Sequence, residues 1–504
     1  MINEHTIRFH DKMQELFLGL SFGDVKLKTR YTEVLPGNAE VGTWLSRNIG
    51  LNIPLISAAM DTVTEYQMAI AMAKQGGIGI LHKNLSTKEI KFNLDRVKNE
   101  LNAKITRPIT VYEGQTIEQI LNMKEEKGFG FHSFPVTSRE GKLVGILTET
   151  DFDFCEDNSL KAAEVMQTNL YTGDEETTLE DAWNMMKEKR ISSLPLTDDN
   201  NNVFGMYVLS DVKRIRAGDG SIYSIDENGQ LRVGVSVGPS IVKDDELLEI
   251  LIKKNVDVIC LETAHAATKN MHEALKYLKE HYNGDVIVGN ISDGENARKL
   301  AELGADGIKV GQGPGAICTT RKVAGVGVPQ VTAIMDTAYE LQRMGDHYKD
   351  VTIIADGGLT YSGDIVIAIA AGADACMAGS LFAGTTEAPG EIFSLDGKMF
   401  KSYRGMGSPG AMKERGSLER YGQVPNKFVA EGVEGAVPYK GPVSDVIFQL
   451  VGGLRSGMGY NGAQTLMGLQ ENARFVRITS AAEWESHPHN LAAMKEAPNF
   501  PAGK

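Results

Sequence analysis

Residues 307–321 read GIKVGQGPGAICTTR, a short apolar run followed by a glycine-rich loop that carries Cys318. The run predicts a buried β-strand, and three glycines keep the loop compact because glycine adopts backbone angles closed to other residues. A cysteine just past the C-terminal end of a strand stands where an α/β barrel places its chemistry. Cys318 is therefore a candidate nucleophile, with two hydroxyls and Arg321 beside it, although a lone free cysteine is more often a buried structural thiol.

Similar strand candidates recur through the sequence, and amphipathic helical stretches such as 65–75 and 293–303 separate them. This alternation of strand and helix is typical of a parallel sheet. Eight units predict a (β/α)₈ barrel, a TIM barrel, although composition alone does not distinguish it from a doubly wound sheet. The eight candidate strands are 51–60, 78–81, 233–237, 256–261, 286–289, 307–310, 351–355 and 375–378.

The alternation stops after the second strand, and an internal repeat takes its place. A fixed offset held by several separate anchors indicates a duplicated unit. We therefore expect residues 1–104 and 216–504 to form one barrel domain and residues 105–215 to form an inserted domain. The anchors, each pair 60 positions apart, are Pro135 and Pro195, Gly145 and Gly205, and Asp151 and Asp211.

The length, composition and net charge of the chain limit the classes of protein to which it can belong. The chain has 504 residues with 42% hydrophobic content, enough for a large domain and a smaller one. Its net charge of −14 argues against a nucleic-acid surface built on bulk charge. Four widely spaced cysteines without a CxxC pair favour a reducing cytoplasm. No signal peptide and no apolar run long enough for a membrane span are expected.

Two later strand ends carry polar and glycine residues. Asp356-Gly357-Gly358 ends one candidate strand and Gly379-Ser380 ends the next, so we expect a phosphoribosyl ligand there, with tight turns as the alternative. The stretch 390–440 reads as loop-rich. Within it, the local sequence of Arg420-Tyr421 favours a solvated charge beside a surface tyrosine. His265 beside Glu262 is weak evidence for a metal.

Several runs together resemble the family of IMP dehydrogenases and GMP reductases, over about residues 20 to 500. The runs that carry the resemblance are 57–65, 77–84, 313–320 with 325–330, 355–358, 403–408, 452–456 and 485–487.

The inserted repeat resembles a tandem pair of cystathionine-β-synthase (CBS, or Bateman) motifs. The resemblance implies that Asp151 and Asp211 hold the ribose of an adenine or guanine nucleotide, with Ser or Thr three residues earlier. Thr148 fills that place in the first copy, whereas Val208 does not in the second. A purely structural insertion remains the alternative.

The family resemblance implies a two-step reaction. Cys318 would attack C2 of IMP, hydride would pass to NAD⁺, and water would release XMP from the covalent adduct. Arg420 would be the base that activates this water, on a mobile flap, with Tyr421 as its partner. Thr320 would contact the water or the substrate and relay to Glu431. An arginine base needs a special site because its free pKa is above 12.

The resemblance also implies sets of binding residues. For IMP they are Met60, Asp356, Gly358, Gly379, Ser380, Tyr403, Gly405, Met406 and Glu431, and for NAD⁺ they are Glu262, Thr263, Asn290, Gly311 and Gly313. A potassium ion is implied at the carbonyls of Gly311, Gly313 and Cys318, completed by Glu485, Ser486 and His487 of a neighbouring subunit. This shared site implies a homotetramer or an octamer, with no membrane or nucleic acid required.

The chain departs from the family pattern at three places. Ala316 stands where serine is usual, Glu262 stands where aspartate is usual, and the flap between Tyr421 and Glu431 is shortened. These departures lie at the expected phosphate, cofactor and flap sites.

Three functions are compatible with the sequence. An IMP dehydrogenase is favoured because the Arg420-Tyr421 pair serves a hydrolysis step. A GMP reductase, which deaminates GMP to IMP with NADPH, would lack that step and that pair. A nucleotide-sensing regulatory protein on a decayed barrel is the third, and the presence of Cys318 argues against it.

Overall fold

The computed structural model describes residues 1–504 except 102–103, 107, 127–132, 217–221, 346–347, 349, 424–427, 491–496 and 501–504. The described chain forms two compact units. One unit combines residues 1–98 with 222–504, and the other contains residues 99–221. Each unit is described by itself below.

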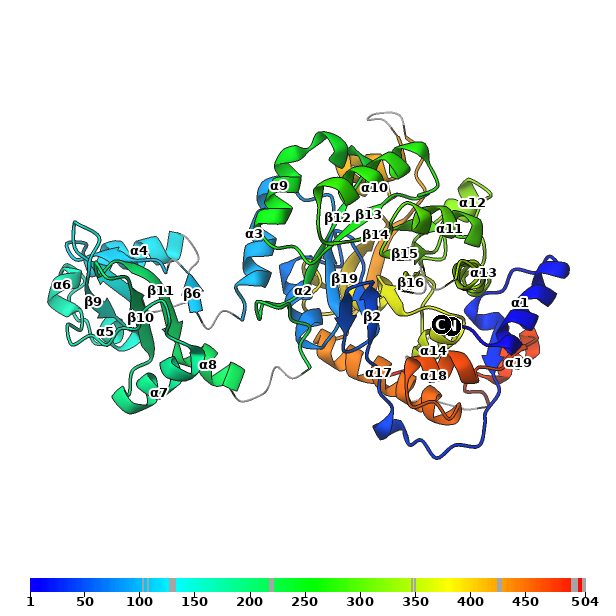
Figure 1. The fold of residues 1–504 in the computed structure, drawn as a ribbon, viewed down its shortest axis with the longest axis horizontal. Helices are drawn as coiled ribbons and strands as arrows, with labels where there is room; N and C mark the ends of the chain where they lie inside the picture. Colours follow the sequence, from blue (N-terminus) through cyan, green and yellow to red (C-terminus); the bar gives the residue numbers. More distant parts are fainter. Residues whose placement is uncertain are drawn as a thin grey trace. The chain divides into compact units, whose positions relative to one another are not determined.

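The larger unit is built on a closed barrel of eight parallel strands, as the sequence predicts (Figure 1). The barrel closes because its two strands that precede the insertion pair with the sixth and the first of the strands that follow it. In order around the barrel the strands are β12 (Val233–Val237), β13 (Val258–Glu262), β14 (Asp285–Ile291), β15 (Gly307–Val310), β16 (Thr352–Asp356), β17 (Ala375–Ala378), β4 (Leu55–Ser57) and β5 (Ile78–Leu81).

Helices surround the barrel and bury the outer faces of its strands (Figure 1). The last of them, α17 (Val443–Tyr460), packs against the helices of the first and seventh units and so completes the ring. The others are α2 (Tyr66–Lys74), α3 (Thr87–Lys98), α9 (Asp245–Lys253), α10 (Lys269–His281), α11 (Gly294–Glu302), α13 (Gln330–Arg343) and α14 (Ser362–Ala370).

The strand predictions match because parallel strands covered on both sides read as continuous apolar runs. Almost every residue of the eight strands is buried. The stretch 51–60 is the exception in length, since only Leu55–Ser57 is barrel strand. Its first residue belongs instead to a hairpin, β2 (Thr43–Ser46) and β3 (Ile49–Leu51), which packs Leu45 into the barrel core. The opposite, C-terminal end of the barrel is left for the site.

The stretch 390–440, read from sequence as loop-rich, contains a three-stranded antiparallel sheet, so that prediction was wrong. Its strands are β18 (Ile392–Leu395), β19 (Lys398–Arg404) and β20 (Glu434–Pro438). Every residue of β18 is exposed, so the strand lacks the buried face that would mark it in sequence. The sheet brings Tyr403 and Arg404, at the end of β19, to the C-terminal end of the barrel.

The chain termini add a small outer layer to the barrel unit (Figure 1). Strand β1 (Val25–Leu27) pairs with β21 (Phe475–Arg477), near the two ends of the chain. The helices of this layer are α1 (Glu4–Glu15), α18 (Leu466–Asn472) and α19 (Ser480–Glu485). No described helix combines the length and the apolar character needed to cross a membrane.

The smaller unit contains two three-stranded sheets, β7-β8-β9 and β10-β11-β6. The two repeats supply matching hairpins, β8 (Phe134–Thr137) with β9 (Leu143–Leu147) and β10 (Ser193–Thr197) with β11 (Val203–Val208). The remaining elements are β6 (Lys104–Thr106), β7 (Val111–Tyr112), α4 (Ile117–Glu126), α5 (Glu149–Asp153), α6 (Ala162–Val165), α7 (Leu179–Lys189) and α8 (Leu209–Arg216).

A buried ion-pair cluster joins the two edges of the barrel unit from which the insertion departs. The Lys98 ammonium lies 2.9 Å from a carboxylate oxygen of Asp226 and 2.7 Å from one of Asp257. The second carboxylate also accepts a hydrogen bond from the Val233 backbone N–H, at the start of β12. Lys98 is 4% exposed, so its charge is balanced by these two acids away from bulk water.

Replacing Lys98 by alanine should strip the charge balance from two buried carboxylates. Breaking a buried pair from one side costs about 3–5 kcal/mol. We expect the calorimetric unfolding transition of the barrel unit to fall by about 5 °C or more. Lys91, exposed on the same helix, is the matched control, and its alanine variant should unfold within about 1 °C of the original protein. Equal shifts in the two variants would contradict a role for the cluster.

Candidate active site

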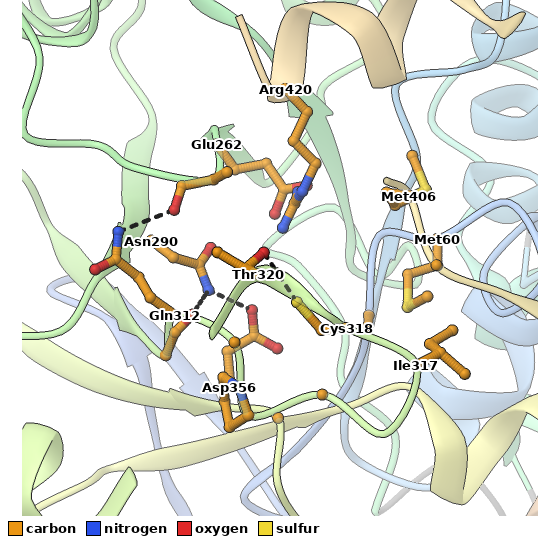
Figure 2. Close-up of a pocket in the computed structure, with 18 of the residues that line it drawn as sticks. Met60, Glu262, Asn290, Gln312, Ile317, Cys318, Thr320, Asp356, Met406 and Arg420 are labelled. Carbon is orange, nitrogen blue, oxygen red and sulfur yellow. Dashed lines mark hydrogen bonds and ion pairs between the residues drawn. The ribbon is translucent and has the colours of Figure 1, made fainter. Parts of the chain in front are cut away.

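A cavity of about 120 Å³ opens at the C-terminal end of the barrel strands (Figure 2). Strand ends supply its polar wall, and the cysteine loop and the segments after β19 supply the rest. Strands β13 to β16 each supply one charged or amide side chain to this wall, and these are Glu262, Asn290, Lys309 and Asp356. The fold therefore brings these four side chains together, although the first and the last of them are 94 positions apart in the sequence.

The cysteine loop follows β15 directly. Gly311 and Gly313 have φ angles of 148° and 78°, values that favour glycine. The loop turns back so that the Cys318 N–H donates to the Gly315 carbonyl at 3.0 Å. The half-buried thiol of Cys318 faces the cavity, and its Sγ lies 3.2 Å from Oγ1 of Thr320. The loop thus presents a sulfur atom beside a hydroxyl.

Arg321 has a different place from the one the local sequence suggests. Its guanidinium donates to the carbonyls of Gln312 at 2.9 Å and Val328 at 2.6 Å. It therefore ties the two ends of the cysteine loop together. This bracing holds the thiol in position, and the direct partner of the sulfur is a hydroxyl.

A chain of charges crosses the polar wall. Lys309 Nζ lies 2.6 Å from Glu262 Oε2 and 2.7 Å from Asp356 Oδ2, and both Lys309 and Glu262 are almost fully buried. Burial raises the pKa of the Glu262 carboxyl, but Arg420, Lys309 and Lys83 outweigh it and lower that pKa to about 2. Burial lowers the pKa of Lys309, yet the two carboxylates raise it further, so the ammonium stays charged. Glu262 and Lys309 therefore stay an ion pair at neutral pH.

Asp356 keeps one oxygen for a ligand. Its Oδ2 accepts hydrogen bonds from Lys309 and, at 2.8 Å, from Nδ2 of Asn290. Its Oδ1 accepts none from the residues that the structure describes. Oδ1 of Asn290 is buried without a partner among them. Asp356 lines the cavity, so its Oδ1 can accept a hydrogen bond from a ligand there. A buried acceptor is normally satisfied, so the Asn290 oxygen also indicates a place for a ligand or water donor.

The opposite side of the cavity is apolar. Met60, Ile317 and Met406 lie on the far side of the Cys318 sulfur from the charged wall (Figure 2). Among the described residues the Tyr403 hydroxyl has the thioether of Met60 as its hydrogen-bond partner, at 4.0 Å, and burial raises its pKa, so it stays protonated. Gly379 leaves room for that hydroxyl, since a Cβ there would lie 2.7 Å from it. A flat, weakly polar ring fits between these methionines and the thiol.

Arg420 and Tyr421 line the cavity, which corrects their local reading as a solvated surface pair. Arg420 is the last residue of a short helix, α16 (Arg415–Arg420), and its guanidinium forms an ion pair with Glu262. Burial lowers the pKa of Arg420, but Glu262 raises it more, to above the usual arginine value. Burial raises the pKa of Tyr421 to about 12. Both groups are therefore fully protonated in this arrangement.

Other residues singled out in the sequence lie around the cavity or away from it. Gly405 and Glu431 line it, whereas Gly358, Gly379 and Ser380 stand just outside, at the ends of β16 and β17. The Thr263 side chain turns away and donates to the His265 carbonyl at 2.9 Å. Glu485 ends α19, which packs near the start of the chain, so residues 485–487 do not reach this cavity.

Sequence reasoning missed two polar residues of the cavity, Lys309 and Gln312. Lys309 was counted as part of an apolar strand, although a lysine inside such a run is itself a signal of a buried charge. The Gln312 amide donates to the Ala264 carbonyl at 3.0 Å and accepts from Oγ of Ser292 at 2.6 Å. Its position between two glycines gave no sign of these contacts.

Comparison with known proteins places the chain in one family. The family model described as "IMP dehydrogenase / GMP reductase domain" matches residues 19–489. An inosine-5′-monophosphate dehydrogenase of Aquifex aeolicus is 46% identical over 487 residues, which is 96% of this chain and 97% of the relative. The inosine-5′-monophosphate dehydrogenase of Bacillus subtilis is also 46% identical, over 96% of this chain and 98% of its own.

Solved structures agree with the sequence relatives on the family. A GMP reductase of Trypanosoma brucei in complex with guanosine 5′-monophosphate superposes with a TM-score of 0.86 at 38% identity, and the match covers 94% of this chain and 98% of that one. The fold, the motifs and the sequence identity over nearly the whole chain therefore indicate the same family. The chain belongs to the IMP dehydrogenase/GMP reductase family.

Proposed function

We propose that the protein is an IMP dehydrogenase, an enzyme that oxidises IMP to XMP with NAD⁺. The curated relatives at 43–46% identity over nearly the whole chain support this activity. The observation that carries the proposal is that Cys318 and the pair Arg420-Tyr421 line the same cavity. The same bound substrate can therefore meet the nucleophile that the oxidation step needs and the pair that positions water for the hydrolysis step.

In the first step the Cys318 thiolate adds to C2 of IMP, and its thiol proton passes to solvent or to a neighbouring base. The C2 hydrogen leaves with its electron pair, so the purine is oxidised and stays bonded to sulfur. Bound NAD⁺ supplies the hydride acceptor. Met60, Ile317 and Met406 hold the purine against the sulfur, which converts the attack into an oriented, unimolecular event.

In the second step water attacks C2, the carbon–sulfur bond breaks, and Cys318 is released as thiolate with XMP. The Arg420 guanidinium orients that water and stabilises the hydroxide character that the water gains as its proton leaves. Because the ion pair with Glu262 raises the pKa of Arg420, a base role requires the guanidinium to leave this partner. Thr320 and Glu431, both on the cavity wall, offer the water proton a second path.

The remaining IMP contacts follow from the unsatisfied groups. Oδ1 of Asp356 accepts from the ribose hydroxyls. Backbone N–H groups of Gly358, Gly379 and Ser380, at two neighbouring strand ends, bind the phosphate. Ala316 is exposed and brings no hydroxyl to this anion, so the backbone donors and Tyr403 carry its recognition.

Glu262 and Asn290 fit the NAD⁺ site on the charged wall. When Arg420 leaves, Oε1 of Glu262 becomes free while Lys309 stays on Oε2, so a carboxylate oxygen faces the cavity for a ribose hydroxyl. The cavity of about 120 Å³ is smaller than the ~300–1,000 Å³ typical of ligand pockets. Arg420 and Tyr421 therefore occupy space that the cofactor needs, and they must withdraw before hydride transfer.

A potassium ion fits the cysteine loop. The carbonyls of Gly313 and Cys318 receive no hydrogen bond from the described part of the chain, and that of Gly311 accepts one, from Asn290, which leaves it a lone pair. Among the described residues no cluster of three His, Cys, Asp or Glu side chains suits a metal, and K⁺ prefers such neutral oxygens. In this proposal Glu485, Ser486 and His487 of a neighbouring subunit complete the potassium site. A site shared between subunits supports a homotetramer, or an octamer made of two tetramers.

The unit of residues 99–221 is proposed as a CBS pair that binds adenine or guanine nucleotides. In the first repeat Oδ2 of Asp151 accepts from the N–H and the hydroxyl of Thr148, both at 2.7 Å, so a ribose would have to share or displace these bonds. The four free cysteines suit a reducing compartment, and we place the enzyme in the cytoplasm.

The proposal is tested by mixing the full-length protein with IMP, NAD⁺ and K⁺ and following NADH by absorbance and XMP by chromatography. Equal amounts of both products are expected. The likeness to the Trypanosoma brucei enzyme makes GMP reductase the second candidate. Oxidation of NADPH with GMP, and no NADH from IMP, would establish that activity instead. Inactivity in both assays would favour the regulatory reading.

A further inference from the structure

The short helix that ends in Arg420 is held by a second carboxylate, Glu419. Its Oε1 accepts a hydrogen bond from the Ser240 N–H at 2.7 Å, in the loop that follows β12. Its Oε2 lies 3.8 Å from Nζ of Lys83, in the loop that follows β5. Lys83 is buried, and it also donates to the carbonyl of Glu262 at 3.2 Å. Glu419 therefore docks α16 on two βα loops beside the partner of Arg420.

Two glycines make room for this docking. A Cβ on Gly238 would lie 2.0 Å from Oε2 of Glu419, and one on Gly416 would lie 2.4 Å from the Lys83 carbonyl oxygen. Gly238 has an ordinary negative φ of −100°, so its small size is needed for space, and the backbone geometry does not demand glycine. A glycine in the loop after β12 and a glycine in α16 thus both leave the space that this docking needs.

A polar chain supports the other edge of α16. Oγ of Ser417 lies 3.0 Å from Nδ2 of Asn84, which also donates to Asp61 at 2.9 Å. Asp61 in turn holds Arg404 at 2.7 Å, next to Tyr403. The helix is therefore docked on Lys83 and Asn84 of the loop after β5 and on a backbone N–H of the loop after β12, and Glu419 is the charged member nearest to Arg420.

We propose that Glu419 is a positioning residue that latches α16, and with it Arg420, over the covalent intermediate, through Lys83 and the Ser240 N–H. The inference rests on the proposed function, in which Arg420 acts only after NADH has left its place beside Glu262. Arg420 and the dinucleotide compete for the side of the cavity beside Glu262. The contacts of Glu419 therefore set the fraction of the covalent intermediate that is hydrolysed. It contributes nothing to hydride transfer, when the flap is away.

The test measures the two steps separately by rapid mixing of the full-length enzyme with IMP and NAD⁺. In Glu419→Ala the burst of NADH should keep its rate and amplitude within about twofold, while steady-state turnover falls about tenfold. The NAD⁺ concentration that half-inhibits turnover should fall severalfold, because the flap competes less well. Glu419→Gln, which can still accept from Ser240, should lose less than Glu419→Ala.

Matched variants sharpen the result. Gly238→Ala fills the seat and should reproduce Glu419→Ala, and the double variant should be no worse than either single one, because both remove one contact. Glu414→Gln makes the same charge change at the exposed start of the same helix and should leave both phases unchanged. Full additivity of the double variant, or equal losses in burst and steady state, would overturn the latch.

Hydrogen exchange gives a readout that does not depend on turnover. In the protein without ligands, amides of residues 416–421 should exchange faster in Glu419→Ala than in the parent, and no faster in Glu414→Gln. Unchanged exchange in Glu419→Ala would contradict the latch even if the parent proved inactive. Absence of an NADH burst in the parent would instead contradict the proposed function, so the two failures are distinguishable.

Discussion

Cys318→Ala should abolish the formation of NADH from IMP, with a loss of at least about 10⁴-fold. Without the sulfur no covalent bond to C2 forms, so the electron pair that expels the hydride is missing. IMP binding should persist within about threefold, because the variant keeps the backbone of the loop and loses only a sulfur whose partners are Oγ1 of Thr320 and the Glu431 carbonyl. Calorimetric titration with IMP and a rapid-mixing NADH assay measure the two quantities.

Cys155→Ala is the matched control for this experiment. Cys155 lies in the unit of residues 99–221, is partly exposed and is not among the residues that line the barrel cavity. Its NADH burst should equal that of the parent. Measurable NADH formation by Cys318→Ala, above contamination by the parent protein, would show that the sulfur is not the nucleophile.

The barrel could be predicted because burial of both faces leaves a plain signal in sequence. Strands β5, β12, β15 and β17 have the predicted bounds because each is a mostly apolar run. The sheet of β18, β19 and β20 could not be predicted in this way. Its first strand faces solvent throughout, and the pairing of β19 with β20 joins residues 30 to 38 positions apart.

Site residues that directly follow a strand could be predicted from the sequence. Contacts that depend on how neighbouring strands pair could not. Cys318 and Asp356 follow strands directly, so their place at one end of the barrel follows from the fold. The contact of Glu262 with Lys309 depends on pairing through Gly289, which lies between them in the sheet. A Cβ on this glycine would lie 2.5 Å from Cβ of Lys309, so the ion pair needs a residue that is informative only once the strands are paired.

Arg420 shows the same limit from the other direction. Its neighbours in sequence are polar, and locally it reads as a surface charge. Its partner Glu262 stands 158 residues earlier, at the end of β13. Only the docking of α16 over the barrel brings them together, so the role of the residue is a property of tertiary contact.

Arg420→Gln should separate the two halves of the reaction. Hydride transfer should proceed at the parent rate, because the guanidinium is not needed while NAD⁺ occupies the wall. Hydrolysis should slow by about 10²–10³-fold, since the water loses both its orientation and the charge that stabilises its attack. Rapid mixing with IMP and NAD⁺ should therefore show a full burst of NADH followed by very slow turnover, with the covalent adduct detectable by mass spectrometry of the intact protein.

The same variant should also alter the charged wall. Glu262 would keep Lys309 but lose the cation that contributes most to lowering its pKa, so that pKa should rise from about 2. At neutral pH the carboxylate remains ionised and is open to the dinucleotide, so inhibition by excess NAD⁺ should begin at lower concentration. Lys413→Gln, an exposed cation just before α16, is the matched control and should change neither phase. Equal loss of burst and turnover in Arg420→Gln would mean that the guanidinium serves the chemistry of Cys318 rather than water, and the assignment of the two steps to two sides of the cavity would fail.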